Sequence, residues 1–235
     1  MKKETLLYEG KAKKVFSTNN PDYVIHFFKN DATAFDGKKK GSIEGKGSIN
    51  AKMTAYIFTK LEEAGIKTHF KELISENEIL TDKVSILPVE VVARNIAAGS
   101  LSKRTGLAEG TPLSAPIVEF YFKNDELGDP LLTEDHIYEL KLVTPEQLKQ
   151  LKESALKINE FLIKFFDSVN LKLVDFKLEF GLNSAGDILL ADEISPDTCR
   201  LWDKDTDEKM DKDRFRRDLG RVEEAYEEVW RRVNG

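Results

Sequence analysis

The stretch Leu173–Asp203, LVDFKLEFGLNSAGDILLADEISPDTCRLWD, decides the fold that we predict for this chain. Residues 174–180 alternate between apolar and charged side chains, and this period of two indicates a β-strand with one buried face. The other face carries an acid, a base and an acid in a row, at Asp175, Lys177 and Glu179. Such a face is an unusual one to leave merely in contact with water.

A hairpin is expected to follow this strand. Residues 183–187 are turn formers, and the next apolar run, Ile188–Ala191, ends at Asp192. If the turn is centred between Ala185 and Gly186, Glu179 and Asp192 lie opposite each other, about 4.5–5.5 Å apart at Cβ. Two carboxylates that close repel unless a cation lies between them or one is protonated, and oxygen ligands suit Mg²⁺. On the residues alone, neutralisation by Lys177 and Arg200 in a surface network is an equal alternative.

A basic turn near the N-terminus is the next candidate site. Gly10-Lys11-Ala12-Lys13 lies between predicted strands at 6–10 and 14–17, and a third strand is expected at 23–29, antiparallel to the second. Glycine allows close approach of the backbone, and the two ammonium groups suit phosphate. The Walker spacing is absent, and the residues alone favour a solvated basic turn. Residues 30–47, which include Asp31, Phe35 and Asp36, predict a mobile loop.

Residues 86–100 form the second informative segment. Alternation along 89–94 places Glu90 and Arg94 on one face of a strand, and Gly99-Ser100 opens a short helix at 101–105. Free N–H groups there could bind an anion, although a serine cap beside a Glu90–Arg94 surface pair is the simpler interpretation.

The remaining elements follow from capping and periodicity. We expect helices at 49–64 after a Ser48 cap, at 145–169 after the Thr144-Pro145-Glu146-Gln147 capping box, and at 210–233. Further strands are expected at 67–70, 78–85 and 117–123. Asp129 precedes a proline and is therefore expected to be extended.

Composition excludes several classes of protein. The net charge of −6 argues against a nucleic-acid footprint, and the single cysteine, Cys199, excludes an intramolecular disulfide. No apolar run approaches about 18 residues, and the N-terminus lacks the apolar core of a signal peptide. We therefore expect a cytoplasmic globular protein.

Three motifs resemble the SAICAR synthetase family: Leu173–Gly181, Ser195-Pro196-Asp197 with Arg200–Asp203, and the Pro-Val-Glu, Arg and Ala-Gly-Ser pattern of residues 88–100. The resemblance implies an α+β fold, SAICAR synthase-like. It has an N-terminal antiparallel sheet like a kinase N-lobe, with one helix and a phosphate-binding turn (1–83). A second, ATP-grasp-like α+β domain (84–235) carries the metal hairpin, the substrate site and the C-terminal helix. Nucleotide is expected in the cleft between them, near the hinge 81–87.

The resemblance also implies an activity. Members join carboxyaminoimidazole ribotide (CAIR) to L-aspartate with ATP and Mg²⁺, giving SAICAR, ADP and phosphate through an acyl phosphate in de novo purine biosynthesis, and a homodimer is implied. The implied catalytic residues are Asp175, Lys177, Glu179 and Asp192, with Glu179 and Asp192 also holding Mg²⁺. The implied ATP-binding residues are Gly10, Lys11, Ala12, Lys13, Val15, Ile86 and Lys123. The implied substrate-binding residues are Glu90, Arg94, Ser100, Asp129, Arg200 and Arg216.

Two other classes of function are weighed against the ligase. A kinase-like phosphotransferase would need a hydroxyl acceptor and a catalytic base, and no HRD-type loop is evident. A non-catalytic nucleotide-binding module would tolerate Glu179→Gln together with Asp192→Asn.

Overall fold

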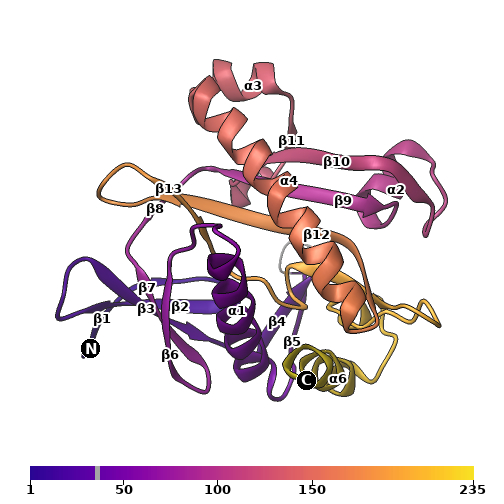
Figure 1. Ribbon diagram of the computed structural model, residues 1–235, viewed down its shortest axis with the longest axis horizontal. Helices are drawn as coiled ribbons and strands as arrows, with labels where there is room; N and C mark the ends of the chain where they lie inside the picture. Colours follow the sequence, from indigo (N-terminus) through magenta and orange to yellow (C-terminus); the bar gives the residue numbers. More distant parts are fainter. Residues whose placement is uncertain (35–37) are drawn as a thin grey trace.

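One long strand organises the larger sheet of the computed structural model, which describes residues 1–34 and 38–235. This strand, β12 (Leu171–Leu182), pairs antiparallel with four others. They are β8 (Ser85–Ile86), β9 (Val89–Ile96), β13 (Ile188–Ala191) and β14 (Cys199–Asp203). Two strands beyond β9 complete the sheet: β10 (Pro112–Phe122) and the edge strand β11 (Leu131–Leu132). The stretch Leu173–Asp203 therefore supplies the centre of this sheet (Figure 1).

The N-terminal part forms a second, five-stranded antiparallel sheet. Its order is β1 (Lys3–Glu9), β2 (Lys13–Thr18), β3 (Tyr23–Phe28), β7 (Glu78–Asp82) and β6 (Phe70–Ser75). The predicted antiparallel pairing of the second and third strands is confirmed. Leu190 of β13 joins the two sheets, because its N–H donates to the Lys67 carbonyl and its carbonyl accepts from the His69 N–H.

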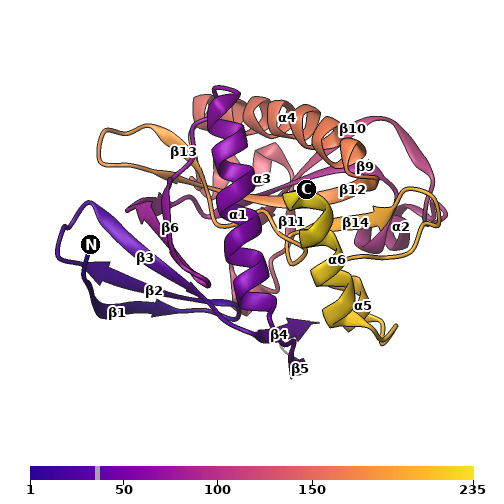
Figure 2. The ribbon, with the colours of Figure 1, turned by 60° about the horizontal axis from the view of Figure 1, so that its bottom comes forward.

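Three long helices cover the sheets. Helix α1 (Lys46–Glu63) packs on the first sheet and against α6 (Val222–Asn234), and α4 (Pro145–Ser168) lies across the second sheet (Figures 1 and 2). The short helices are α2 (Gly99–Thr105), η1 (Asp125–Leu127), α3 (Glu134–Glu139) and α5 (Asp213–Arg216). A single hydrophobic cluster extends from Phe58 of α1 to Phe166 of α4 and Leu178 of β12. The two sheets thus share one core.

The predicted start of α4 is confirmed. The Thr144 hydroxyl accepts from the Gln147 N–H (3.2 Å), the Gln147 side chain accepts from the Thr144 N–H (2.9 Å), and Pro145 occupies the first turn. This reciprocal pair satisfies two backbone donors that a helix N-terminus otherwise leaves without partners.

Two predicted helix boundaries were wrong. Helix α1 starts at Lys46 after Gly45, whose φ of 73° is left-handed, so Ser48 lies inside the helix. The segment 210–233 is not one helix, because α5 and α6 are separated by a turn in which Asp218 and Arg221 have positive φ.

The predicted loop at 30–47 contains regular structure. Strands β4 (Asp31–Ala34) and β5 (Lys39–Ser42) pair antiparallel. Phe35 and Asp36 lie outside the described residues. The first sheet ends at Asp82 and the second begins at Ser85, close to the expected boundary, but the division into two domains stays a prediction. No helix within the described ranges is long and apolar enough to cross a membrane.

Candidate active site

The hairpin that follows β12 differs from the predicted register. Glu179 pairs with Ala191, not with Asp192, because the turn is centred on Ala185. The Asn183 side chain explains this register, since it accepts from the N–H groups of Ala185 and Asp187 and holds all of 183–187 in the turn. Asp192 therefore lies one residue past the pair Glu179–Ala191, after the end of β13. Its φ of 61° turns the chain there.

Glu179 and Asp192 nevertheless meet at a common ammonium group. Lys177 Nζ lies 2.5 Å from Glu179 Oε1, 3.5 Å from Asp192 Oδ2 and 3.1 Å from Glu90 Oε1. Lys13 contacts the other oxygen of Asp192. Together with Lys123, whose Nζ is 3.1 Å from Glu179, these groups form what we call the lysine–carboxylate cluster. Its six members are Lys13, Glu90, Lys123, Lys177, Glu179 and Asp192.

Two members of the cluster hold their charges strongly. Burial alone would lower the pKa of Lys177, but Glu179, Asp192 and Glu90 raise that pKa well above its ordinary value. Burial would likewise raise the pKa of Asp192, yet Lys13 and Lys177 bring it far below the usual range. Lys177 therefore stays protonated and Asp192 ionised at neutral pH. This state suits Lys177 to act as a cation and not as a nucleophile or base.

The basic turn before β2 faces this cluster. Gly10 N–H donates to the Lys13 carbonyl (2.8 Å), which closes the turn and directs Lys13 to Asp192. Lys11 forms an ion pair with Asp125 of η1, with Nζ and Oδ1 2.7 Å apart. Lys13 is thus held against the lysine–carboxylate cluster, which is more than a solvated turn would do, whereas Lys11 and Asp125 stay largely exposed.

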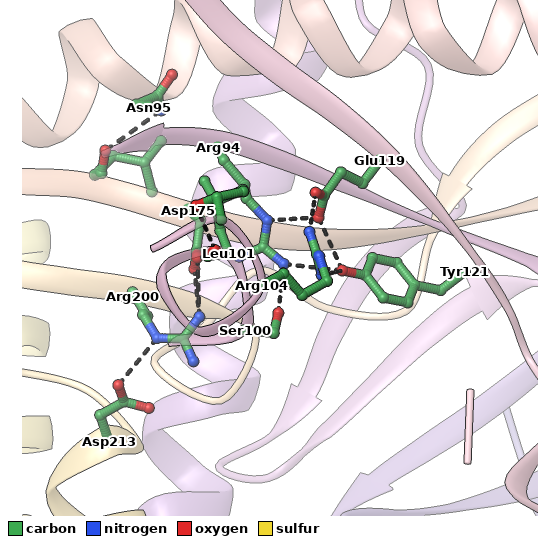
Figure 3. A network of polar contacts seen from close by, with 12 residues as sticks. Arg94, Asn95, Ser100, Leu101, Arg104, Glu119, Tyr121, Asp175, Arg200 and Asp213 are labelled. Atoms are coloured by element: carbon green, nitrogen blue, oxygen red, sulfur yellow. Dashed lines mark hydrogen bonds and ion pairs between the residues drawn. The ribbon is translucent and has the colours of Figure 1, made fainter. Parts of the chain in front are cut away.

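A second group of polar residues, the arginine network, surrounds the other end of the charged row of β12 (Figure 3). Arg94 of β9 donates from Nη1 to Asp175 (2.7 Å), from Nε to Glu119 (2.7 Å) and from Nη2 to Ser100 (3.0 Å). Arg200 of β14 donates from Nη1 to both Asp175 oxygens, at 3.0 and 2.9 Å. The register of the sheet explains this meeting, since Asp175 pairs with both Arg94 and Arg200 across the two neighbouring strands.

The alternative interpretation of Arg94 as a partner of Glu90 is wrong. Glu90 contacts Lys177, whereas Arg94 is almost fully buried with Asp175 and Glu119. Burial would lower the pKa of Arg94, but Asp175 and Glu119 raise it.

Four members of the network were not predicted from the sequence. Arg104 of α2 donates to Tyr121 (3.0 Å) and contacts Glu119, and Tyr121 donates to Glu119 (2.8 Å). Asp213 of α5 accepts from Arg200 Nε (2.9 Å) and from Arg216 Nη1 (2.6 Å). The alternation of Glu119 with Tyr121 on a recognised strand could have identified that pair. Nothing local in the sequence places Asp213 beside Arg200.

Three expected site residues lie apart from the two groups. Asp129 has a φ of 47°, so the prediction that it is extended was wrong; its carboxylate accepts from the Asn124 N–H, which stabilises this bend. Val15 of β2 pairs with His26, and Ile86 of β8 is exposed beside Gly181. Their roles stay predictions.

The donor set of the lysine–carboxylate cluster fits Mg²⁺. Glu179 and Asp192 supply only oxygen ligands, which a hard divalent cation prefers. Both carboxylates contact the ammonium group of Lys177, so they lie close enough to share one cation. Within the described ranges, no group of three or more His, Cys, Asp or Glu side chains is placed to hold a metal. A two-carboxylate site completed by water and phosphate is therefore the form that these residues allow.

Comparisons with known proteins identify the family of this chain. The model of the SAICAR synthetase family matches residues 6–233. A phosphoribosylaminoimidazole-succinocarboxamide synthase of Bacillus mycoides is 58% identical over 235 residues, which cover 100% of this chain and 98% of that protein.

Solved structures show the same likeness. The crystal structure of phosphoribosylaminoimidazole-succinocarboxamide synthase from Ehrlichia chaffeensis is 50% identical, covers 98% of both chains and has a TM-score of 0.96. A SAICAR synthetase in complex with ADP is also 50% identical, with 96% of each chain covered and a TM-score of 0.93. The chain therefore belongs to the SAICAR synthetase family.

Proposed function

We propose that this protein is the ATP-dependent ligase that joins CAIR to L-aspartate, giving SAICAR, ADP and phosphate in purine biosynthesis. The single observation that carries the proposal is that one strand, β12, supplies residues to both polar groups. Asp175 anchors the arginine network, and Lys177 with Glu179 anchors the lysine–carboxylate cluster. The four residue steps from Asp175 to Glu179 span about 13 Å of strand. One extended substrate can therefore contact both groups.

The lysine–carboxylate cluster is suited to the phosphates of ATP. Three ammonium groups converge there with three carboxylates, and Lys11 lies on the same turn as Lys13. Glu179 and Asp192 would hold Mg²⁺, which when bound neutralises phosphate charge. The ammonium groups of Lys13 and Lys177 can then leave their carboxylate partners and bind phosphate oxygens instead. The relative solved with ADP supports a nucleotide site in this fold.

The arginine network is suited to the ribotide phosphate. Arg94 is buried and donates hydrogen bonds to Glu119, Asp175, Ser100 and Tyr121, so we assign it the role of holding Asp175 and Ser100 in place. Arg104, Arg200 and Arg216 keep 34%, 19% and 30% of their side chains exposed, and their guanidinium groups are the ones that a phosphate can reach.

The chemistry requires activation of a carboxylate, because oxide is a poor leaving group. The CAIR carboxylate oxygen attacks the γ-phosphorus of ATP, its O–P bond forms and ADP leaves. The aspartate amine then attacks the acyl carbon, the C–N bond forms, phosphate departs with that oxygen, and the amine loses a proton. Lys13 and Lys177 stabilise the charge that develops on the transferred group, and alignment supplies the remainder of the catalysis. No side chain has to act as a nucleophile.

An isotope experiment tests the intermediate. CAIR labelled with ¹⁸O in its carboxylate should yield phosphate that carries one ¹⁸O per turnover, detected by ³¹P NMR. Unlabelled phosphate at full turnover would contradict an acyl phosphate.

The metal assignment is tested by substitution. Glu179→Gln with Asp192→Asn should abolish turnover and the dependence of ATP binding on Mg²⁺, whereas Asp187→Asn in the exposed turn of the same hairpin should change neither. Normal turnover by the double variant would overturn the assignment. The homodimer and the cytoplasmic location implied by the resemblance stay predictions, and sedimentation velocity tests the first.

A further inference from the structure

Asp213 accepts hydrogen bonds from both Arg200 and Arg216, and no other acid among the described residues does so. Its Oδ2 accepts from Arg200 Nε at 2.9 Å, and its Oδ1 accepts from Arg216 Nη1 at 2.6 Å. Asp213 itself is 5% exposed and is the first residue of α5. Both oxygens are thus committed to guanidinium groups that retain surface of their own.

The position of Asp213 is set by the turn before it. Its N–H donates to Asp211 Oδ1 (2.7 Å), and the other oxygen of Asp211 accepts from the N–H of Leu201, the residue after Arg200 (2.9 Å). Asp211 therefore ties the start of α5 to β14. The two ends of the Arg200–Asp213 pair cannot move independently.

Arg200 is restrained on its remaining sides. Asp175 occupies Nη1, and a Cβ at Gly99 would lie 2.5 Å from Nη2. The guanidinium group therefore lies against the backbone of Gly99, the residue before Ser100. Among the hydrogen bonds of the described residues, none uses Nη2 of Arg200, which leaves this nitrogen for a ligand.

We propose that Asp213 is a positioning residue for ribotide binding, which holds Arg200 and Arg216 at a fixed separation as two arms of one phosphate clamp. This inference rests on the proposed function. Asp213 does not touch substrate; it acts through the two arginines. An anion that approaches between them meets donors that are already oriented, so little side-chain entropy is lost on binding.

Asparagine is the sharpest substitution, because it keeps the shape of aspartate but can accept from only one of the two arginines. Asp213→Asn should raise the KM for CAIR and the Kd for SAICAR by about tenfold to a hundredfold, as expected for a lost charge-assisted hydrogen bond. The KM for ATP should stay within about twofold of the wild type, since the lysine–carboxylate cluster is not involved.

The matched control is Asp218→Asn. Asp218 lies in the turn after α5, pairs with Lys39 and is 86% exposed, so the variant makes the same change of charge nearby. It should leave both KM values unchanged. Thermal unfolding of each variant, and calorimetric titration with SAICAR in the absence of ATP, separate binding from stability.

The outcomes are distinct. If Asp213→Asn and Asp218→Asn have the same KM for CAIR, the inference is wrong. It is also wrong if Asp213→Asn raises the KM for CAIR and the KM for ATP equally and lowers the melting temperature, because Asp213 would then stabilise the fold in general. The substitutions Asp213→Asn and Arg216→Gln should also be clearly non-additive on SAICAR binding; additive effects would contradict the clamp. Turnover by the wild type tests the proposed function. The KM for CAIR of Asp213→Asn relative to that of Asp218→Asn tests the role of Asp213, so a failure of one proposal can be distinguished from a failure of the other.

Discussion

Lys177 is the residue on which the lysine–carboxylate cluster depends, because three carboxylates share its ammonium group. Lys177→Gln should lower the rate of SAICAR formation by about a hundredfold or more, since one preorganised cation is removed from the site of phosphoryl transfer. The initial rate at saturating ATP and CAIR is the measurement.

A control on the same strand makes this test specific. Lys172 lies on β12, is partly exposed and pairs with the exposed Asp207, so Lys172→Gln should keep the wild-type rate. Equal rates for the two variants would refute the role of Lys177.

At the scale of elements, the entry to α2 is fitted to the side chain of Arg200. Gly99 has a φ of 55°, and an alanine Cβ there would clash with the guanidinium group. Gly99→Ala should therefore raise the KM for CAIR about tenfold or more, measured in steady-state kinetics.

Gly106 supplies the matched control, because it ends α2 with a φ of 76° and a Cβ there would meet nothing within 4 Å. Gly106→Ala carries a similar backbone strain of about 1–2 kcal/mol without the clash. If it raises the KM for CAIR as much as Gly99→Ala, strain and not contact with Arg200 explains the effect.

The turn before α5 should make stability depend on pH. Burial, and then the neighbouring Asp213, raise the pKa of Asp211 from 3.8 to about 7. The folded protein thus binds a proton that the unfolded chain does not hold above about pH 4, so this stabilisation is present at low pH and is lost as the pH rises through about 7. From about pH 5 to about pH 8 the contribution of Asp211 to the free energy of unfolding should fall by about 2–3 kcal/mol.

Denaturant unfolding of the wild type and of Asp211→Asn across this range measures that contribution. The stability of the wild type relative to Asp211→Asn should fall as the pH rises, because asparagine does not ionise. A difference that stays constant would show that Asp211 does not change its protonation over this range.

The elements also show what sequence patterns can and cannot predict. Period-two alternation located β9 and β12, and the Thr144 capping box located α4, because these signals arise within a few residues. The hairpin register was missed by one residue because the Asn183 side chain holds the turn centred on Ala185. The break between α5 and α6 depends on Arg214, which donates to the Gly220 carbonyl and so stabilises the turn between the two helices. Contacts of that kind have no local signature.

For the whole molecule, the shared core predicts a single unfolding transition. The hydrophobic cluster joins α1 and the first sheet to α4 and β12, and β13 bonds to residues 67 and 69. Fluorescence of Trp202 and Trp230, which lie in the second half of the chain, should therefore follow the same melting curve as far-UV circular dichroism. ADP with Mg²⁺ should raise both midpoints together. Two separate transitions would show two independent units instead.

The overall architecture could be predicted from the motifs, whereas the composition of the site could be predicted only in part. Lys177, Glu179 and Asp175 were identified because they alternate on one strand. Glu119, Arg104 and Asp213 join them through strand pairing and through the approach of α5 to β14, which bring together residues distant in the chain. Such long-range placement is a property of the packed molecule and not of any one segment.

The proposed ligase is tested most directly by the release of ADP from Mg·ATP in the presence of CAIR and L-aspartate, with each omitted in turn. We expect that sustained release needs both substrates and that SAICAR forms in equal amount with ADP. Sustained ADP release without L-aspartate, or no SAICAR from a folded protein that binds ATP, would contradict the proposed ligase.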